Sequence, residues 1–221
     1  MDEIIDIHPH VLATDPAAYP LAPLGGKVSG WASTRPVTTE QLLAQMDATG
    51  IAQAALVQAS TAYGYDNSYV LDSAARYPER FVAVGCLDPL APDGPAKVAE
   101  LAGLPQLAGI RLFTTGSTLP NQAQWLSDEA TAPFWAAAEG TGLPVCVQMR
   151  LSAADQLVSV LERYPSARIV LDHIAYPPIA PGQERAAFDE LAPLAKYPQL
   201  HLKLTIRNIE PLATADAAAF L

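Results

Sequence analysis

Seven short apolar runs, separated by segments with a helical pattern, constrain the fold of this chain more than any other feature. Many of their residues are β-branched, and turn-forming residues bound each run. Several runs, such as FVAVGCL, are apolar on both faces, as parallel strands are when helices cover both sides of a sheet. The runs are Ile4–His8, Ala54–Ala59, Phe81–Leu87, Gly109–Phe113, Pro144–Met149, Arg168–His173 and Leu200–Thr205.

Helical patterns with start and stop signals fill the intervals between these runs. Residues 38–41, Thr-Thr-Glu-Gln, predict a capping box, and Asp66 or Asn67 is expected to cap the next helix. Asp128 is expected to open another helix, and Pro193 to interrupt the last one. Strands that alternate with helices predict βαβ units and a parallel sheet.

The predicted fold class is α/β, a (β/α)8 TIM-barrel-like fold whose eighth strand is missing from this chain. The expected organisation is one barrel domain over residues 1–221 that carries strands one to seven. We expect a C-terminal truncation, because an unclosed barrel leaves two strand edges unpaired. No glycine-rich phosphate-binding loop follows any of the runs, which argues against a dinucleotide-binding or nucleotide-hydrolysing fold.

Charge and composition exclude several classes of function. The net charge is -10, with 13 Lys and Arg against 23 Asp and Glu, which argues against nucleic acid and anionic membranes as partners. No apolar run approaches the roughly 20 residues of a membrane span, and the first residues lack a signal-peptide pattern. Cys86 and Cys146 are interpreted as small buried hydrophobes of a cytoplasmic protein. The expected partner is a small-molecule substrate, and a homo-oligomer is compatible with the sequence.

The first run carries a candidate metal site. Asp6, His8 and His10 lie at every second position, so an extended backbone would point all three side chains to one face. Two imidazoles at the carboxyl end of a first barrel strand are half of a metal site, at the end where barrel active sites lie. The alternative is one histidine that caps the strand and one exposed to solvent.

A second histidine position follows the sixth run. His173 ends IVLDH and is expected at the same end of the barrel as His8 and His10. The alternative is a packed histidine hydrogen-bonded to backbone. Asp172 has the opposite parity and is expected to face the helices, and Lys203 is expected to pair with Asp6.

Four further side chains are candidates for substrate binding. Arg111 and Arg150 lie at strand carboxyl ends, and guanidinium groups bind carboxylates in a bidentate manner. Salt bridges to loop carboxylates are the alternative for both arginines. Gln148 is expected to point into the barrel, and Tyr63 to line its mouth beside a long loop over residues 12–36. We interpret that loop as part of a substrate lid, although ordinary packing explains it equally well.

These motifs together resemble the amidohydrolase superfamily. The order of IDIHPH, YPERFVAVGCLDP, GIRLF, LPVCVQMR and ARIVLDHIAYPP is similar to that of its amidohydrolase-related branch, and the resemblance covers residues 4 to about 206. That branch holds 2-pyrone-4,6-dicarboxylate lactonase, sugar lactonases such as L-fuconolactonase, and decarboxylases of the aminocarboxymuconate-semialdehyde type.

The resemblance implies a distorted barrel that hydrolyses or decarboxylates small, often carboxylated, molecules. It implies His8 and His10 as metal ligands and His173 as a further active-site histidine. The implied cofactor is one divalent metal, zinc or manganese, although some lactonases of the branch manage without a tight metal. This chain departs from the pattern in two places, with Gln148 where metal-dependent members carry histidine, and without the strand-eight Asp.

The Gln148 departure favours a hydrolase that opens the lactone of a small carboxylated substrate. In this hypothesis the strand-eight Asp activates water, His8, His10 and His173 act on the carbonyl, and the arginines hold a carboxylate. These 221 residues alone are then expected to be poorly active. The alternatives are a metal-dependent decarboxylase of an aromatic or muconate-type acid, or an inactive paralogue that binds a small acid.

Overall fold

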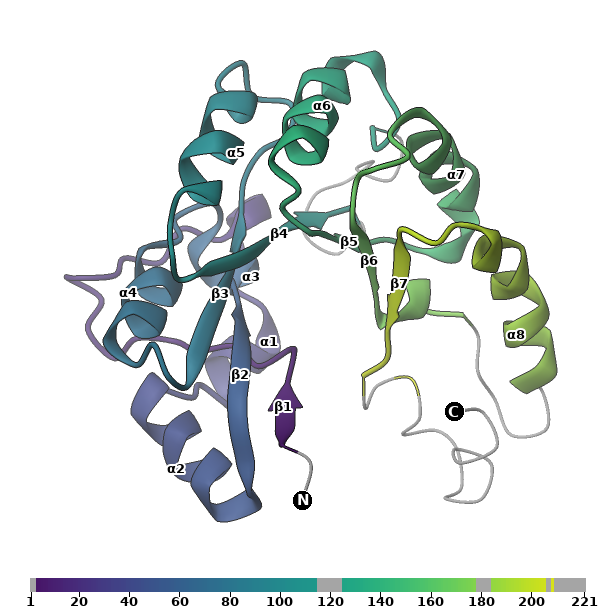
Figure 1. Cartoon of the computed structure of the whole chain (residues 1–221). Helices are drawn as coiled ribbons and strands as arrows, with labels where there is room; N and C mark the ends of the chain where they lie inside the picture. Colours follow the sequence, from purple (N-terminus) through teal and green to yellow (C-terminus); the bar gives the residue numbers. More distant parts are fainter. Residues whose placement is uncertain (1–2, 115–124, 178–183, 206–207, 209–221) are drawn as a thin grey trace. The chain divides into compact units, whose positions relative to one another are not determined.

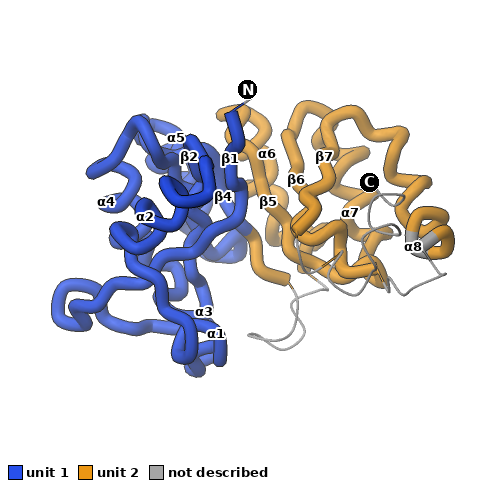
Figure 2. Tube along the Cα trace, turned by 90° about the horizontal axis from the view of Figure 1, so that it is seen from below, with its two compact units in different colours: residues 1–111 blue, residues 112–221 orange. Residues whose placement is uncertain are grey.

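The computed structural model describes residues 3–114, 125–177, 184–205 and 208. The chain divides into two compact units, residues 1–111 and 112–221, which Figure 2 draws in different colours. The boundary between the units falls inside strand β4, Leu107–Phe113.

Unit 1 is built on parallel strands that pair in chain order: β1 (Ile4–Asp6), β2 (Ile51–Val57), β3 (Phe81–Cys86) and β4. Figure 1 shows helices between successive strands, as parallel connections require. The helical elements of unit 1 are η1 (Leu24–Gly26), α1 (Gly30–Thr34), α2 (Thr39–Thr49), α3 (Ser60–Tyr63), α4 (Ser68–Arg76) and α5 (Gly94–Ala102).

Unit 2 continues the pattern with β5 (Val145–Gln148), β6 (Ile169–Asp172) and β7 (Leu200–Lys203), again parallel and paired in chain order. Its helical elements are η3 (Glu129–Thr131), α6 (Ala132–Thr141), η4 (Leu151–Ala153), α7 (Ala154–Arg163), η5 (His173–Ala175), α8 (Glu184–Leu191) and η6 (Ala192–Lys196).

The seven expected strands are all present, with ends that differ by a few residues from the apolar runs. The largest shift is at β2, which begins at Ile51 because Gly50, with φ 74°, ends α2 directly before it. The capping box of α2 is confirmed: Thr38 and Gln41 each accept a hydrogen bond from the other's backbone N–H. The sequence patterns did not predict α5, a helix of nine residues between β3 and β4.

Of the two side chains expected to cap α4, Asp66 makes hydrogen bonds at the start of the helix and Asn67 does not. Asp66 Oδ1 accepts hydrogen bonds from Ser68 N and Ser68 Oγ, at 3.0 and 2.5 Å. Asn67 makes no cap, because its side chain binds the backbone at the end of β3. Its Oδ1 accepts from Cys86 N at 2.7 Å and its Nδ2 donates to Cys86 O at 2.8 Å. Asn67 therefore joins the start of α4 to the carboxyl end of a neighbouring strand.

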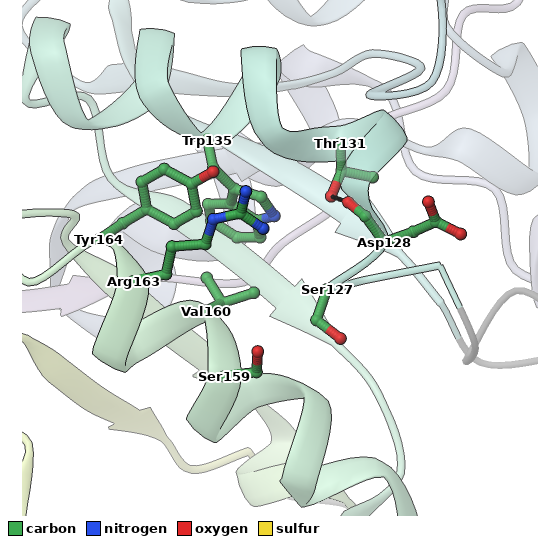
Figure 3. A pocket seen from close by; sticks show the side chains of 8 residues that line it. All are labelled: Ser127, Asp128, Thr131, Trp135, Ser159, Val160, Arg163 and Tyr164. Carbon is green, nitrogen blue, oxygen red and sulfur yellow. Dashed lines mark hydrogen bonds between the residues drawn. The ribbon is translucent and has the colours of Figure 1, made fainter.

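Each unit has an apolar core between its helices and strands. In unit 1, Met46 of α2 and Val70 of α4 pack with Leu56 and Phe81 of the sheet. In unit 2, Leu157, Val160 and Leu161 of α7 are buried, and Trp135 of α6 stacks on Tyr164 with ring centroids 6.3 Å apart. A narrow crevice opens between α6 and α7 beside this pair (Figure 3). Its lining residues are Ser127, Asp128, Thr131, Trp135, Ser159, Val160, Arg163 and Tyr164.

A buried ion pair joins the last two strands. Asp172 and Lys203 are register partners, and Lys203 Nζ lies 3.0 Å from Asp172 Oδ1 and 3.6 Å from Cys146 Sγ. The Asp172 and Lys203 side chains are 0% and 4% exposed. Paired residues of parallel strands point to the same side of a sheet, so the two charged side chains meet, and the orientation of Asp172 toward the helices stays a prediction. The ion partner that the structure gives Lys203 is Asp172, in place of the expected Asp6.

Among the residues that the structure describes, no helix combines the length and the apolar character that a membrane crossing requires.

Lys203→Met is expected to lower the free energy of unfolding by about 3–5 kcal/mol, because it leaves the Asp172 carboxylate buried without its counter-charge. The double variant with Asp172→Asn should recover part of this loss. Arg163→Met is the matched control, since it breaks an exposed ion pair to Glu129, and should cost about 1 kcal/mol or less. Urea unfolding curves measure all three. A loss in Lys203→Met no larger than in the control would contradict the argument.

Candidate active site

The candidate residues of unit 1 begin where β1 ends. The strand stops at Asp6, because the Asp6 carboxylate turns back to accept a hydrogen bond from His8 N at 3.0 Å. The strand is therefore two residues shorter than the predicted run Ile4–His8, and the common face of Asp6, His8 and His10 stays a prediction. The structure still brings the two histidines together, with their ring centroids 5.2 Å apart and their planes at 89°.

The ring of His10 is held on two sides. Its Nδ1 lies 2.7 Å from Val57 O at the end of β2, and a carbonyl oxygen can only accept, so Nδ1 carries the proton. Nε2 is then the nitrogen with the lone pair when the ring is neutral. Trp31 stacks on the other side, with ring centroids 5.1 Å apart and planes at 25°. His10 thus has a fixed tautomer and a fixed plane.

The long loop over residues 12–36 packs against α3. Ala22 N donates to Ala62 O at 2.8 Å, and a small buried cluster under the loop includes Leu12, Ala32 and Ala62. Gly64, with φ 59°, permits this close approach, because a Cβ there would lie 2.5 Å from Ala22 O. The loop also supplies Trp31, whose contact with His10 the sequence did not reveal. Its role as a substrate lid stays a prediction.

Tyr63 lies at the end of α3 and is buried. Its hydroxyl oxygen accepts a hydrogen bond from Ala13 N at 2.8 Å. Burial raises the pKa of Tyr63, so the hydroxyl stays protonated well above neutral pH. This contact ties the start of the long loop to α3, and the role of Tyr63 in substrate binding remains a prediction.

Arg111 lies on β4 with 4% of its surface exposed. Its register partner on β3 is Cys86. Burial raises the pKa of the Cys86 thiol to about 12, although the positive charge of Arg111 acts in the opposite direction. Cys86 is therefore a neutral thiol at physiological pH, which fits the expected buried hydrophobe. Guanidinium groups bind carboxylates in a bidentate manner, so Arg111 stays a candidate for binding the carboxylate of a substrate.

In unit 2, the two candidate residues near the end of β5 differ in burial and in position. Gln148 is the last residue of the strand and is 7% exposed. Its backbone carbonyl oxygen accepts hydrogen bonds from Thr114 N and Thr114 Oγ1, at 2.9 and 2.6 Å. Arg150 lies two residues later, where η4 begins, and is exposed. Gln148 thus has a fixed backbone position at the strand end, while Arg150 belongs to the loop that follows.

His173 begins a left-handed turn directly after β6. His173, Ile174, Ala175 and Tyr176 have φ angles of 54°, 45°, 61° and 53°, which are costly for residues other than glycine. The turn is closed by a hydrogen bond from Tyr176 N to His173 O at 2.9 Å, and the two rings lie 4.8 Å apart. A strained backbone of this kind often lies at a functional site.

Thr205 and Asn208, which both follow β7, hold this turn, and the sequence did not single out either of them. Thr205 Oγ1 lies 2.7 Å from His173 Nδ1, and Asn208 Nδ2 donates to His173 O at 2.8 Å. Asn208 Oδ1 also accepts from Thr205 N and Thr205 Oγ1, at 3.0 and 3.2 Å. Such a network depends on the pairing of β6 with β7, which no sequence pattern specifies.

Within the described ranges, no cluster of three or more His, Cys, Asp or Glu side chains is arranged to hold a metal ion. The residues that fit a metal best are His8 and His10, because their rings are adjacent and the Nδ1 contact of His10 leaves Nε2 as the ligand nitrogen. Two imidazoles supply half of the four ligands of a tetrahedral zinc site.

Comparison with known proteins gives consistent results. The family model described as Amidohydrolase matches residues 5–220. An L-fucono-1,5-lactonase of Burkholderia ambifaria is 32% identical over 170 residues, which are 77% of this chain and 56% of the relative. The chain thus spans little more than half the length of that curated relative.

Two solved structures show the same fold. An amidohydrolase from Burkholderia multivorans with bound zinc superimposes with a TM-score of 0.76 at 21% identity, and the match covers 99% of this chain and 77% of that one. A probable 2-pyrone-4,6-dicarboxylic acid hydrolase from Acinetobacter baumannii, with citric acid bound, has a TM-score of 0.73 at 20% identity, over 99% and 78% of the two chains. These likenesses confirm the predicted TIM-barrel-like amidohydrolase fold.

Tyr63→Phe is expected to loosen the start of the long loop, because Ala13 N loses its acceptor. Hydrogen exchange of the Ala13 amide should accelerate about tenfold, the equivalent of one ordinary hydrogen bond of about 1.4 kcal/mol. Tyr65→Phe is the control, since Tyr65 is 37% exposed, and should leave this amide unchanged. Equal exchange in Tyr63→Phe and the wild type would show that the contact does not hold the loop.

Proposed function

The chain belongs to the amidohydrolase family, and from this premise we propose that it takes part in opening the lactone ring of a small carboxylated molecule. The lactonase relative supports the reaction, and the hydrolase structure with bound citric acid supports a carboxylated ligand. The observation that carries the proposal is the fixed, acceptor-ready ring of His10 beside His8 at the end of β1.

In each unit the candidate residues lie at or just beyond the carboxyl ends of strands. His8 and His10 follow β1, Gln148 ends β5 and His173 follows β6. In a TIM-barrel-like fold the carboxyl ends of all strands belong to one face, which carries the active site. We therefore propose an active-site role for each of the four side chains.

In the proposed reaction, the oxygen of a water molecule forms a bond to the lactone carbonyl carbon. The water loses one proton to a basic group, and negative charge develops on the carbonyl oxygen. The bond between this carbon and the ring oxygen then breaks, and the ring oxygen takes up a proton to give a hydroxy acid. His173 hydrogen-bonds to the attacking water, and Gln148 offers a neutral amide to the substrate.

A divalent metal fits the imidazoles of His8 and His10, with zinc or manganese as the ion. When bound, it would supply a positive charge that favours negative charge on the carbonyl oxygen. The residues that complete its coordination lie outside the pair, since His8 and His10 provide two nitrogen ligands.

Arg111 and Arg150 are proposed to bind the carboxylate of the substrate. Arg111 is buried on β4, where a bidentate contact would be shielded from water, whereas Arg150 is exposed on a loop. We therefore assign the main contact to Arg111 and place Arg150 at the edge of the site, together with Tyr63. The buried thiols Cys86 and Cys146 support the prediction that the protein works in the reducing cytoplasm.

A panel of lactones tests the proposal. 2-Pyrone-4,6-dicarboxylate and a neutral sugar 1,5-lactone are incubated with the protein, and ring opening is followed by acid release and by NMR of the product. We expect hydrolysis of the carboxylated lactone, a loss of at least about 100-fold in kcat for His173→Gln, and an unchanged rate for the control His201→Gln on β7. Arg111→Met should raise KM for the carboxylated lactone selectively.

Other outcomes of the panel would contradict the proposal. Release of carbon dioxide from an aromatic or muconate-type acid, with no lactone opened, would favour a decarboxylase. Ligand-induced stabilisation without turnover would favour a protein that only binds a small acid.

Zinc titration followed by calorimetry tests the metal ligands. We expect His10→Gln and His8→Gln each to weaken zinc binding by at least about tenfold, because each removes one of two imidazole ligands. His201→Gln is again the control, since His201 is exposed on β7 and should leave the affinity unchanged. Equal affinity of the wild type and His10→Gln would contradict the assignment.

A further inference from the structure

We propose that Thr205 and Asn208 are positioning residues that fix His173 as the Nδ1–H tautomer, so that its Nε2 accepts a hydrogen bond from the attacking water. The proposal rests on the proposed function only in its last step, the identity of the group that Nε2 meets. The tautomer and the hydrogen-bond directions follow from the described residues alone.

The direction of the hydrogen bonds is set by Asn208. Its Oδ1 accepts from Thr205 N at 3.0 Å, which identifies this atom as the amide oxygen, and it lies 3.2 Å from Thr205 Oγ1. An amide oxygen cannot donate, so the hydroxyl of Thr205 must give its single proton to Asn208. Thr205 Oγ1 can then only accept from His173 Nδ1, 2.7 Å away, and Nδ1 must carry a proton.

The network closes on itself through the backbone. Asn208 Nδ2 donates to His173 O at 2.8 Å, so the same residue that orders the hydroxyl of Thr205 also holds the carbonyl of the histidine. Asn208 is 5% exposed and His173 is 7% exposed, so water competes little for these contacts. His173, Thr205 and Asn208 therefore form a closed ring of hydrogen bonds with one consistent direction.

The same network also contacts the left-handed turn that follows β6. Left-handed backbone is costly for residues other than glycine, and four such residues follow one another from His173 to Tyr176. The turn persists only when surrounding contacts determine it. Asn208 and Tyr176 N both bind the His173 carbonyl, which is the first carbonyl of the turn. The device that sets the tautomer thus also sets where the ring lies.

This assignment gives His173 a definite role. With the proton on Nδ1, the neutral ring has its lone pair on Nε2 and accepts a hydrogen bond from water there. It does not donate to the lactone carbonyl, which the other tautomer would do. In the reaction, one O–H bond of the water points to Nε2 and the water oxygen forms the bond to carbon. No bond to His173, Thr205 or Asn208 forms or breaks.

Long-range 1H–15N NMR of the imidazole rings tests the tautomer without any substrate. The chain has four histidines, so loss of one spin system in His173→Gln assigns the ring. We expect the wild-type pattern of the Nδ1–H form. Thr205→Val should shift His173 toward the Nε2–H form, and Thr205→Ser should restore the wild-type pattern because it keeps the hydroxyl.

Thr131→Val provides the matched control. Thr131 is a buried threonine in unit 2 whose hydroxyl donates to backbone at Asp128 O, 2.7 Å away, as the close-up of the crevice shows (Figure 3). Its loss removes a buried hydroxyl away from the His173 network, and should leave the His173 spectrum unchanged. In the lactone assay, Thr205→Val should lower kcat on the order of 10- to 100-fold with little change in KM, the usual cost of losing an orienting partner.

Each result is decisive for one part of the proposal. A wild-type His173 in the Nε2–H form would overturn it without any variant, and an unchanged tautomer in Thr205→Val would overturn the role of Thr205. If the tautomer behaves as expected but no lactone is opened, the proposed function fails while the positioning network stands. If lactones are opened and Thr205→Val keeps full kcat, the network does not serve the reaction.

Discussion

The pairing of β6 with β7 is the constraint on which the His173 half of the candidate site depends. The register sets Asp172 opposite Lys203, and their ion pair is buried at the carboxyl ends of both strands. The residues that follow the strands then meet: His173 comes one position after Asp172, and Thr205 two positions after Lys203. A slip of one residue would turn the side chains of a strand to the other face, and would separate both pairs at once. The ion pair therefore fixes a position as well as contributing stability.

The same principle operates at the amino-terminal end of the chain. Val57 ends β2, and its N–H donates to Pro9 O at 2.9 Å while its carbonyl accepts from His10 Nδ1. The pairing of the first two strands thus continues past the end of β1 and orders the histidines that follow. In both units a histidine ring is oriented by a group from the neighbouring strand end: a backbone carbonyl for His10, and a threonine hydroxyl for His173. Each arrangement puts the proton on Nδ1 and leaves Nε2 as the acceptor.

The sequence predicts the strands well because each is an apolar run with clear limits, and it predicts the start of α2 because a capping box is a local signal. It fails where a long-range contact overrides a local one. Asn67 has the sequence of a helix cap but binds the backbone of β3. Lys203 was expected to pair with Asp6, whereas its partner in the structure is Asp172. Alternation along one strand does not reveal which residue lies opposite on the neighbouring strand.

The turn after β6 is the clearest case, since Ile174 and Ala175 give no sign of positive φ. Asn208 and Thr205, which lie more than 30 residues away, contact its first residue. The histidines of the site could therefore be predicted from sequence, but not the residues that orient them.

Gln148 connects these arguments to the choice of reaction. A neutral amide is a weaker metal ligand than imidazole, so a site with Gln148 at the end of β5 depends less on a metal and more on oriented hydrogen bonds. Its backbone is fixed by Thr114 on one side, and its side chain is largely buried. Hydrolysis of an activated ester needs an ordered water and a stabilised oxyanion, and the side-chain amide of Gln148 can donate a hydrogen bond to such an oxyanion. Removal of a carboxylate needs a strong positive charge to stabilise the carbanion, and the neutral amide of Gln148 supplies no such charge at the end of β5. The composition of the site therefore favours the opening of a lactone over decarboxylation.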